Sequence, residues 1–538
     1  MHQKSLLEIV LPSARRLLAV HIALLILLSC IPALAQKQQQ KLPSPDKIVD
    51  NYLKAVGGKK RVAAVKDTSF EWAVMEQGQP VGNIEVRTKA PAAVRVDVRA
   101  GGVESTNAVN SSTVWEEVSL NKDDSNKKVQ TLTGVDANVA KIEALLLASR
   151  FVNYKKLNLL ARTVTLDESG SEPAYVIEFS SRNGARLRCW FGQSGKLLLK
   201  IERGKTYSQF ADYRAEQQGI LEPHRMEGNS IALGSGQTLV LQSVRYNTGL
   251  SDALFDPPRG AETIDIGALL REVDRNQEQV EERVGDYTYT EKRTERKING
   301  RGEVTEETVK VFEIYPIPNR DSVRKLVSEN GVPLSVEKAA KEEKRVTEEL
   351  EKAQREREKA AQKRARELER QKGKPAKEEE ADVGIADFLR AAEMVSPRRE
   401  RLREREAIVF DFRPRVGYKP KNSTESIISK LTGVMWIDPV DKQVMRLEAR
   451  LVESYKMGGG LLASVRPGTA FVFEQKRMDD GVWLPVFAQV NISAKVLIFK
   501  GIDLNIMQEF SNYQKFNSSF DDYKLTAPEN KGQPPSNP

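Results

Sequence analysis

The sequence predicts an α+β protein with two tandem antiparallel sheets, each covered by helices, and a long charged helical insertion in the second. Two observations support this fold class. A helical pattern is followed by residues that alternate between apolar and polar, as in strands with one buried face, and the same order begins again near residue 263. The 538 residues also exceed what one hydrophobic core usually supports. We therefore expect two domains, residues 44–258 and 263–518, and a disordered tail at 519–538.

The first 35 residues have the order of a cleavable secretion signal. Basic residues up to Arg16 precede an apolar run at 17–28, and the small-residue triplet 33–35 precedes Gln36. An apolar core of about a dozen residues is shorter than the roughly 20 needed to span a bilayer. We expect cleavage between Ala35 and Gln36 and a periplasmic product without a transmembrane span. In the alternative, Cys30 lies in a sequence that loosely resembles a bacterial lipoprotein box and would carry a lipid anchor.

Removal of this signal leaves His224 as the only imidazole and Cys189 as the only thiol. One cysteine cannot form an internal disulfide, and one histidine with one cysteine cannot build an ordinary zinc site. The sequence has no GxSxG, HExxH, P-loop or GxGxxG pattern in a usable context. A carboxylate hydrolase stays a remote alternative, because no pair of acidic residues is singled out. We therefore expect no enzymatic activity, no cofactor and no metal site.

The charge balance gives a weaker indication. The net charge of +9 falls to about +7 without the signal, which carries three basic residues and one acidic residue. A net positive charge can favour binding to nucleic acid or to anionic membranes. An exported protein encounters membranes rather than nucleic acid. We expect no nucleic-acid partner.

The first domain begins with a helix and continues as strands. Residues 43–46 supply a helix start and Gly57-Gly58 a stop. Valine at every second position of 94–98, with charged residues between, predicts a strand with one buried face. A second helix is expected over 136–154. Further strand patterns, joined by turns into hairpins, lie at 175–179, 187–191, 197–201, 225–233 and 238–246.

The second domain repeats this order around a charged middle. A helix is expected over 264–284, and a hairpin turns at Asn299-Gly300. Residues 336–406 are dense in Glu, Lys, Arg, Ala and Gln, with opposite charges spaced for an exposed helix. Their apolar positions are too sparse for a sustained heptad seam, so a solvated charged helix or partly disordered arm and a partner-binding coiled coil both stay open. Within this segment, 385–395 has the pattern of a short amphipathic helix.

A gapless alignment supports a duplication. Residues 190–202 align with 436–448 so that the apolar positions of each fall on one face of a hairpin. The identical pairs are Trp190 with Trp436, Lys196 with Lys442, and Glu202 with Glu448. A G-x-x-x-P turn follows in both, at 219–223 and 481–485.

The first domain resembles the LolA/LolB-like family of periplasmic lipoprotein carriers and outer-membrane acceptors. The resemblance lies in a helix leading into a one-sided antiparallel sheet, a covering helix, a strand pair at 187–201, and a closing Val244-Arg245-Tyr246-Asn247 before Phe255. It covers 44–258 and, more faintly, 263–518. It implies a strongly curved, unclosed half-barrel whose apolar face, lidded by helices, shelters acyl chains from water.

Aliphatic and aromatic side chains on one face of the strands are the candidate walls of such a cavity. Burying one methylene of an acyl chain is worth about 0.8 kcal/mol and needs no metal or histidine. The same side chains could instead contact the domain's own helices as core. The candidates are Val94, Val96, Val98, Ile177, Phe179, Phe191, Leu199, Ile201, Met435, Ile437, Met445 and Leu447. Trp190 and Trp436 fall on the opposite face and are expected to be packing or rim residues.

The expected function is therefore that of a non-enzymatic carrier that binds a lipid or a lipoprotein acyl chain in the periplasm. The alternative is a structural or interaction protein with filled half-barrels, whose charged arm at 336–406 binds an envelope partner.

Overall fold

The computed structural model describes residues 42–120, 127–229, 236–284, 286–300, 302–317, 320–370, 385–457, 463–496 and 499–515. The helices and strands of these described residues lie in one compact unit, Pro45–Pro538. The predicted signal, its cleavage site at Ala35 and Gln36, and the predicted tail lie outside the described residues. Within them, no helix combines the length and the apolar character needed to cross a membrane.

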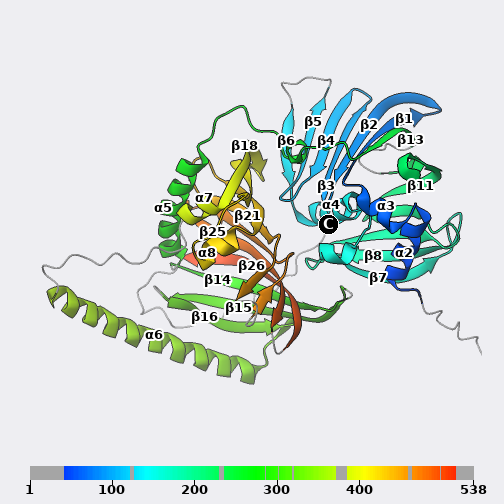
Figure 1. Ribbon diagram of the computed structural model, residues 1–538. Helices are drawn as coiled ribbons and strands as arrows, with labels where there is room; N and C mark the ends of the chain where they lie inside the picture. Colours follow the sequence, from blue (N-terminus) through cyan, green and yellow to red (C-terminus); the bar gives the residue numbers. More distant parts are fainter. Residues whose placement is uncertain are drawn as a thin grey trace, which may run out of the picture. The chain divides into compact units, whose positions relative to one another are not determined.

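The first sheet contains thirteen antiparallel strands in the order β6-β5-β4-β3-β2-β1-β13-β12-β11-β10-β9-β8-β7. The strands are β1 (Asp67–Glu76), β2 (Gln79–Lys89), β3 (Ala93–Ala100), β4 (Val103–Val109), β5 (Val114–Leu120), β6 (Lys128–Leu132), β7 (Leu160–Asp167), β8 (Ala174–Ser180), β9 (Arg186–Gly192), β10 (Leu198–Arg203), β11 (Thr206–Ala215), β12 (Leu221–Gly228) and β13 (Gln237–Tyr246). The first strand pairs with the last, so consecutive hairpins extend the sheet in both directions from its middle (Figure 1).

Three helices belong to the first sheet: α2 (Pro45–Ala55), α3 (Lys59–Ala64) and α4 (Gly134–Ala148). Helix α4 is apolar on most of its circumference because both of its flanks are buried. One flank packs its alanines against Val94, Val109 and Val114. The other flank packs Ile142 and Leu146 into the core formed by β8, β9 and β10. We call the face that α4 covers the inner face of this sheet (Figure 1).

The second sheet also contains thirteen strands, eleven of them in the order β17-β16-β15-β14-β26-β25-β24-β21-β20-β19-β18, with β22 pairing β23 and β23 pairing β25. The strands are β14 (Tyr287–Ile298), β15 (Val304–Ile317), β16 (Arg320–Glu329), β17 (Val332–Pro333), β18 (Ala392–Leu402), β19 (Arg405–Pro414), β20 (Leu431–Ile437), β21 (Val444–Leu451), β22 (Tyr455–Met457), β23 (Ala463–Val465), β24 (Ala470–Arg477), β25 (Trp483–Val496) and β26 (Phe499–Lys515). Here too the first strand, β14, pairs with the last, β26.

Four helices accompany the second sheet: α5 (Ile266–Val284), α6 (Val336–Arg370), α7 (Ile385–Ala391) and α8 (Ser423–Ile428). Helix α5 packs Leu270 and Val273 against apolar residues of β19 and β20, and we call this face the inner face of the second sheet. The charged helix α6 is anchored by its first half. Its Glu342 accepts a hydrogen bond from the Leu326 backbone amide of β16 at 2.8 Å.

Two secondary-structure predictions differ from the structure. The predicted helix 136–154 ends at Ala148, because Arg150, Phe151 and Asn153 adopt left-handed backbone conformations. The predicted helical segment 336–406 is helical in α6 and α7, but Ala392–Leu402 forms the edge strand β18. Its charged residues suggested a solvated helix, yet Arg398 and Glu400 are buried and pair with each other at 2.6 Å.

A buried charge cluster joins the edge strands β6 and β18. Arg398 contacts Asp411 of β19 at 3.1 Å and donates to the Thr131 hydroxyl of β6 at 2.5 Å. Thr131 in turn donates its backbone amide to Glu400 at 2.7 Å. Burial raises the pKa of Asp411 to about 6, against the attraction of Arg398 and with added repulsion from Asp256. One buried cation therefore serves two buried carboxylates at this contact.

Replacing Asp411 should change how stability depends on pH. Because its pKa is raised from 3.8 to about 6, the folded protein holds a proton that the unfolded chain releases between about pH 4 and 6. The contribution of Asp411 to the free energy of unfolding should fall by on the order of 2 to 3 kcal/mol as pH rises through this window. Urea denaturation should show a flatter pH profile for D411N. The exposed carboxyl variant D479N is the control, and parallel profiles for D411N and wild type would contradict the assignment.

A second buried ion pair ties α4 to the sheet. Arg150, just after α4, contacts the Glu222 carboxylate of β12 at 2.5 Å, and the Tyr246 hydroxyl of β13 donates to the same carboxylate at 2.6 Å. Both charged side chains are nearly enclosed.

The substitution E222Q should cost about 3–5 kcal/mol of unfolding free energy, because it leaves the Arg150 charge buried without its partner. The matched control is E227Q on the same strand, which breaks an exposed pair with Arg225. Its expected cost is below about 1 kcal/mol. Equal costs for the two variants in urea denaturation would refute a special role for the buried pair.

Candidate functional site

The candidate residues of β8, β9 and β10 lie in a packed core. Ile177, Phe179, Phe191 and Ile201 are at most 1% exposed. The Phe191 ring lies 5.4 Å from that of Tyr52 on α2. Helices therefore fill the inner face of this part of the first sheet.

Two of the three candidates on β3 pack beside α4, and the third packs among apolar residues of the sheet itself. Val94 is buried against α4, and Val96 packs between two apolar clusters. Val98 is partly buried beside Trp72 and Ile84. Here as well, the predicted walls contact the protein's own side chains.

Two candidates, Leu199 and Met445, do not lie on the inner face of the sheet where they were expected. Strict alternation placed Leu199 and Met445 inward, but the register between each pair of strands shifts at this point. Leu198 takes the inward place in the first sheet, where it is buried, and Leu199 does not join the core. In the second sheet Val444 packs inward, while Met445 lies on the outer face against Trp436 and other residues. A β-bulge inserts one residue into a strand and so reverses the alternation beyond it.

The two tryptophans lie on the outer faces, as predicted, and share one arrangement. The Lys200 ammonium lies 4.4 Å from the centre of the Trp190 ring and pairs with Glu202 at 2.7 Å. In the second sheet the Arg446 guanidinium lies 5.9 Å from the Trp436 ring and pairs with its own glutamate, Glu448, at 2.6 Å. Trp436 is 1% exposed and belongs to a packed apolar cluster on this outer face, and Trp190 is partly buried, so both are packing residues.

The inner face of the second sheet is only partly covered. Met435 and Ile437 are buried beneath α5, and Leu447 packs beside them near α7. Residues that lie directly opposite each other on neighbouring strands form a row across the sheet. Beyond Leu447 this row continues through Phe473, Ala488 and Gln508. The parallel rows of paired residues next to it carry further apolar side chains on the same inner face.

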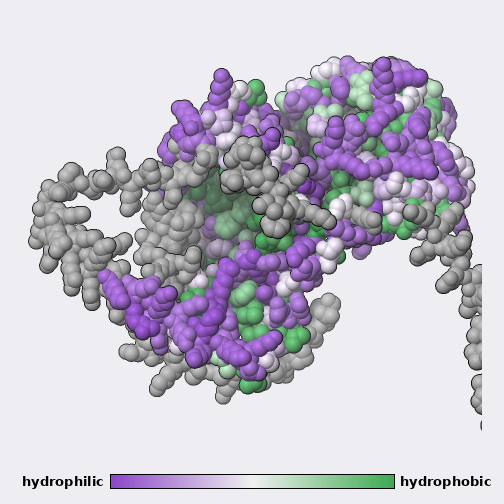
Figure 2. All heavy atoms as spheres, turned by 60° about the horizontal axis from the view of Figure 1, so that its bottom comes forward, coloured by the Kyte–Doolittle hydropathy of each residue, from purple (hydrophilic) through white to green (hydrophobic). Residues whose placement is uncertain are grey.

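We call this continuation the apolar stripe. It is formed by inward positions of β24, β25 and β26, each half-buried and none belonging to the packed apolar clusters of the described residues. Its members are Phe471, Phe473, Ala488, Val490, Ile492, Leu504 and Ile506. Figure 2 shows hydrophobic residues gathered in a hollow with hydrophilic residues around it. Among the described residues, the clusters formed with α5, α7 and α8 do not include the side chains of this stripe.

The sequence analysis missed the stripe, although its signal was present. Phe471 and Phe473 alternate with other residues, as do Val490 and Ile492, and Leu504 and Ile506. This period of two is the pattern of a strand with one apolar face. The walls predicted from the sequence end with the aligned repeat 436–448, and the stripe lies on the strands that follow this repeat.

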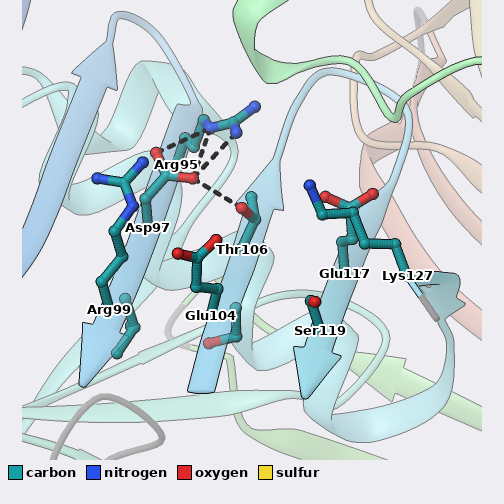
Figure 3. Close-up of a pocket in the computed structure, with 10 residues that line it drawn as sticks. Arg95, Asp97, Arg99, Glu104, Thr106, Glu117, Ser119 and Lys127 are labelled. Atoms are coloured by element: carbon teal, nitrogen blue, oxygen red, sulfur yellow. Dashed lines mark hydrogen bonds and ion pairs between the residues drawn. The ribbon is translucent and has the colours of Figure 1, made fainter. Parts of the chain in front are cut away.

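A small polar hollow of about 140 Å³ lies on the outer face of β3, β4 and β5 (Figure 3). Arg95 and Thr106 bind the Asp97 carboxylate at 2.9 and 2.7 Å. Burial raises the pKa of Asp97, but these hydrogen bonds and the nearby arginines outweigh it and hold that pKa below its ordinary value. The Asp97 carboxylate is thus already bound by Arg87, Arg95 and Thr106, which leaves it little to offer a ligand.

No group of three or more His, Cys, Asp or Glu side chains with metal-binding geometry occurs among the described residues. The Cys189 thiol is buried in the first core, and its burial raises its pKa. His224 lies on β12, where its Nε2 contacts Glu216 at 2.9 Å and its Nδ1 contacts the Glu222 carbonyl at 3.1 Å. The imidazole is thus held by acceptors of its own strand and the preceding turn.

No protein-family model and no curated protein matches the chain. Solved structures are similar to it in part. A LolA-superfamily protein from Nitrosomonas europaea has 15% identity over 40% of this chain and 99% of its own, with a TM-score of 0.27. An outer membrane lipoprotein-sorting protein domain from Vibrio parahaemolyticus has 13% identity over 38% and 97%, with a TM-score of 0.24. The MucA/MucB complex of Pseudomonas aeruginosa has 9% identity over 87% and 99%, with a TM-score of 0.17. The first of these is a member of the family that the sequence resembles.

Two phenylalanines test the difference between the filled and the open inner face. F191A should cost about 3–5 kcal/mol of unfolding free energy, because it opens a cavity in a packed core. F473A should cost clearly less, because a half-buried ring has fewer neighbours to lose. Urea denaturation of both variants gives the comparison. A cost for F473A as large as that for F191A would mean that the stripe is an ordinary core.

Proposed function

We propose that the protein is an exported, non-enzymatic carrier that binds the acyl chain of a lipid or lipoprotein on the apolar stripe of its second sheet. The supporting observation is that stripe: seven aliphatic and aromatic side chains on one face of three neighbouring strands, half-buried and outside the packed clusters. Exposed apolar surface of this kind marks interaction sites. An acyl chain gains about 0.8 kcal/mol for each methylene that it buries there.

The size of the stripe suits a chain of this type. Alternate residues of a strand lie about 6.5–7 Å apart, and neighbouring strands about 4.8 Å apart. Val490 and Ile492 together with the flanking strands therefore span roughly one nanometre in each direction. All of the side chains in this area are hydrocarbon, so a ligand there needs no hydrogen bonds from the floor of the site.

We further propose that the two sheets are tandem copies of one domain, 44–258 and 263–518, with 336–406 as an insertion in the second. The aligned segments 190–202 and 436–448 form β9–β10 and β20–β21, which are the third and fourth strands after α4 and after α7, with α8 between β19 and β20 in the second sheet. The aligned Lys196 and Lys442 both have positive φ, +57° and +51°, and both precede a β-bulge. In this view one copy is filled by α4 and the other binds the ligand.

Binding of a neutral amphiphile tests the stripe. Wild-type protein should bind monolaurin, and the double variant F471S/F473S should bind it at least about tenfold more weakly, because each ring contributes one to a few kcal/mol of apolar contact. Isothermal titration of detergent-free protein gives the affinities. The control V472S lies between the two rings in sequence but faces the outer side, opposite Glu448 and Gln489.

The same preparation should release acyl species on denaturation, detected by mass spectrometry. Protein that carries no acyl species and binds no monolaurin would refute the carrier function. The alternative, an interaction protein whose charged helix α6 binds an envelope partner, would then be favoured, since the first sheet already has a filled interior.

A further inference from the structure

Two basic residues face each other on the inner face of the second sheet, close to the apolar stripe. Arg293 of β14 lies directly opposite Lys310 of β15 and, on its other side, directly opposite Gln508 of β26. Gln508 is itself opposite Ala488 of the stripe. Like charges placed directly opposite each other on neighbouring strands destabilise a sheet. This pair therefore has a cost that an anion between the two cations would relieve.

Each of the two cations already has one carboxylate partner on the inner face of the sheet, and both partners are partly exposed. Arg293 contacts Glu295 at 2.6 Å, and Lys310 contacts Glu329 at 3.6 Å. Both carboxylates are more than 40% exposed, and exposed ion pairs are worth about 0–1 kcal/mol. A ligand can replace such partners at little cost. The Arg293 Nε, by contrast, is enclosed and has no hydrogen-bond partner.

A further carboxylate near the basic pair, that of Glu291, already has partners of its own. Glu291 is buried on the inner face, where Gln508 donates to it at 2.6 Å and Arg324 contacts it at 3.5 Å. It therefore has two partners of its own and does not neutralise Arg293 or Lys310. An anionic head would therefore compete for the two cations only with the exposed carboxylates of Glu295 and Glu329.

Building on the carrier function proposed above, we propose that the ligand is an anionic amphiphile. Its acyl chain lies on the apolar stripe, and its phosphate or carboxylate head lies on Arg293 and Lys310. A guanidinium presents its donors in a planar fork that matches either head, and charge-assisted hydrogen bonds are shorter and stronger than neutral ones. The stripe supplies affinity for the chain, and the basic pair selects the sign of the head.

Calorimetric titration with three probes tests this assignment: dodecyl phosphate, monolaurin and inorganic phosphate. Wild-type protein should bind dodecyl phosphate more tightly than monolaurin, and only the former should weaken as salt is raised. R293Q should weaken dodecyl phosphate binding about tenfold, the loss expected for one charge-assisted hydrogen bond, and leave monolaurin binding unchanged. K310Q should give a smaller loss in the same direction, and it provides the second test if R293Q does not fold.

The control is R296Q, on the same strand. Arg296 faces the outer side, where it pairs with Glu307 at 2.5 Å, so its loss should affect neither probe. Equal affinities for dodecyl phosphate and monolaurin, unchanged in R293Q and K310Q, would overturn the anionic head while leaving the carrier function intact. Absence of binding by both amphiphiles would overturn both proposals. Inorganic phosphate that binds as tightly as dodecyl phosphate would identify a free-anion site and likewise overturn the amphiphile.

Discussion

Coverage of the inner face of each sheet is the constraint on which this structure depends. An antiparallel sheet with one apolar face must bury that face against another layer. In the first sheet α4 meets this need with both flanks, so alanines contact β3, β4 and β5 while Ile142 and Leu146 contact β8, β9 and β10. In the second sheet α5 and α7 cover the side near β19 and β20. The difference between a filled and an open half thus follows from the placement of helices, not from the strands.

Helix composition explains that difference. Helix α4 has apolar residues around most of its circumference, so it can be buried between two parts of one curved sheet. Helix α6 of the second sheet is dominated by charged residues, and the side chains that it buries in its described part include Val346 and Ala353. A helix with that composition cannot enter an apolar interior, because each charge would lose its hydration. The strands after it therefore keep an apolar face that α6 does not fill.

Much of the architecture was predictable from the sequence, and the failures have specific physical causes. Periods of two and 3.6 located α2, α5 and many strands of the first sheet, because one face of each is apolar and the other polar. Strand β18 was not predicted, since Arg398 and Glu400 are buried as a pair and charged residues normally indicate exposure. Leu199 and Met445 were assigned to the wrong face because a β-bulge cannot be recognised from alternation alone. The candidate site could be predicted only as a class of apolar walls, since which walls are covered depends on helix packing.

The position of the basic pair adds a final step to this reasoning. Along the row that crosses the second sheet, side chains change from apolar at Phe473 and Ala488 to neutral polar at Gln508 and then to basic at Arg293 and Lys310. Two facing cations repel each other across the strands, and their carboxylate partners, Glu295 and Glu329, are each more than 40% exposed and so offset that repulsion weakly. A surface that receives an amphiphile needs this order of side chains, since the ligand itself changes from apolar to charged along its length. The proposed ligand would account for both the apolar stripe and the facing cations, beyond which the row continues to Glu329 of β16.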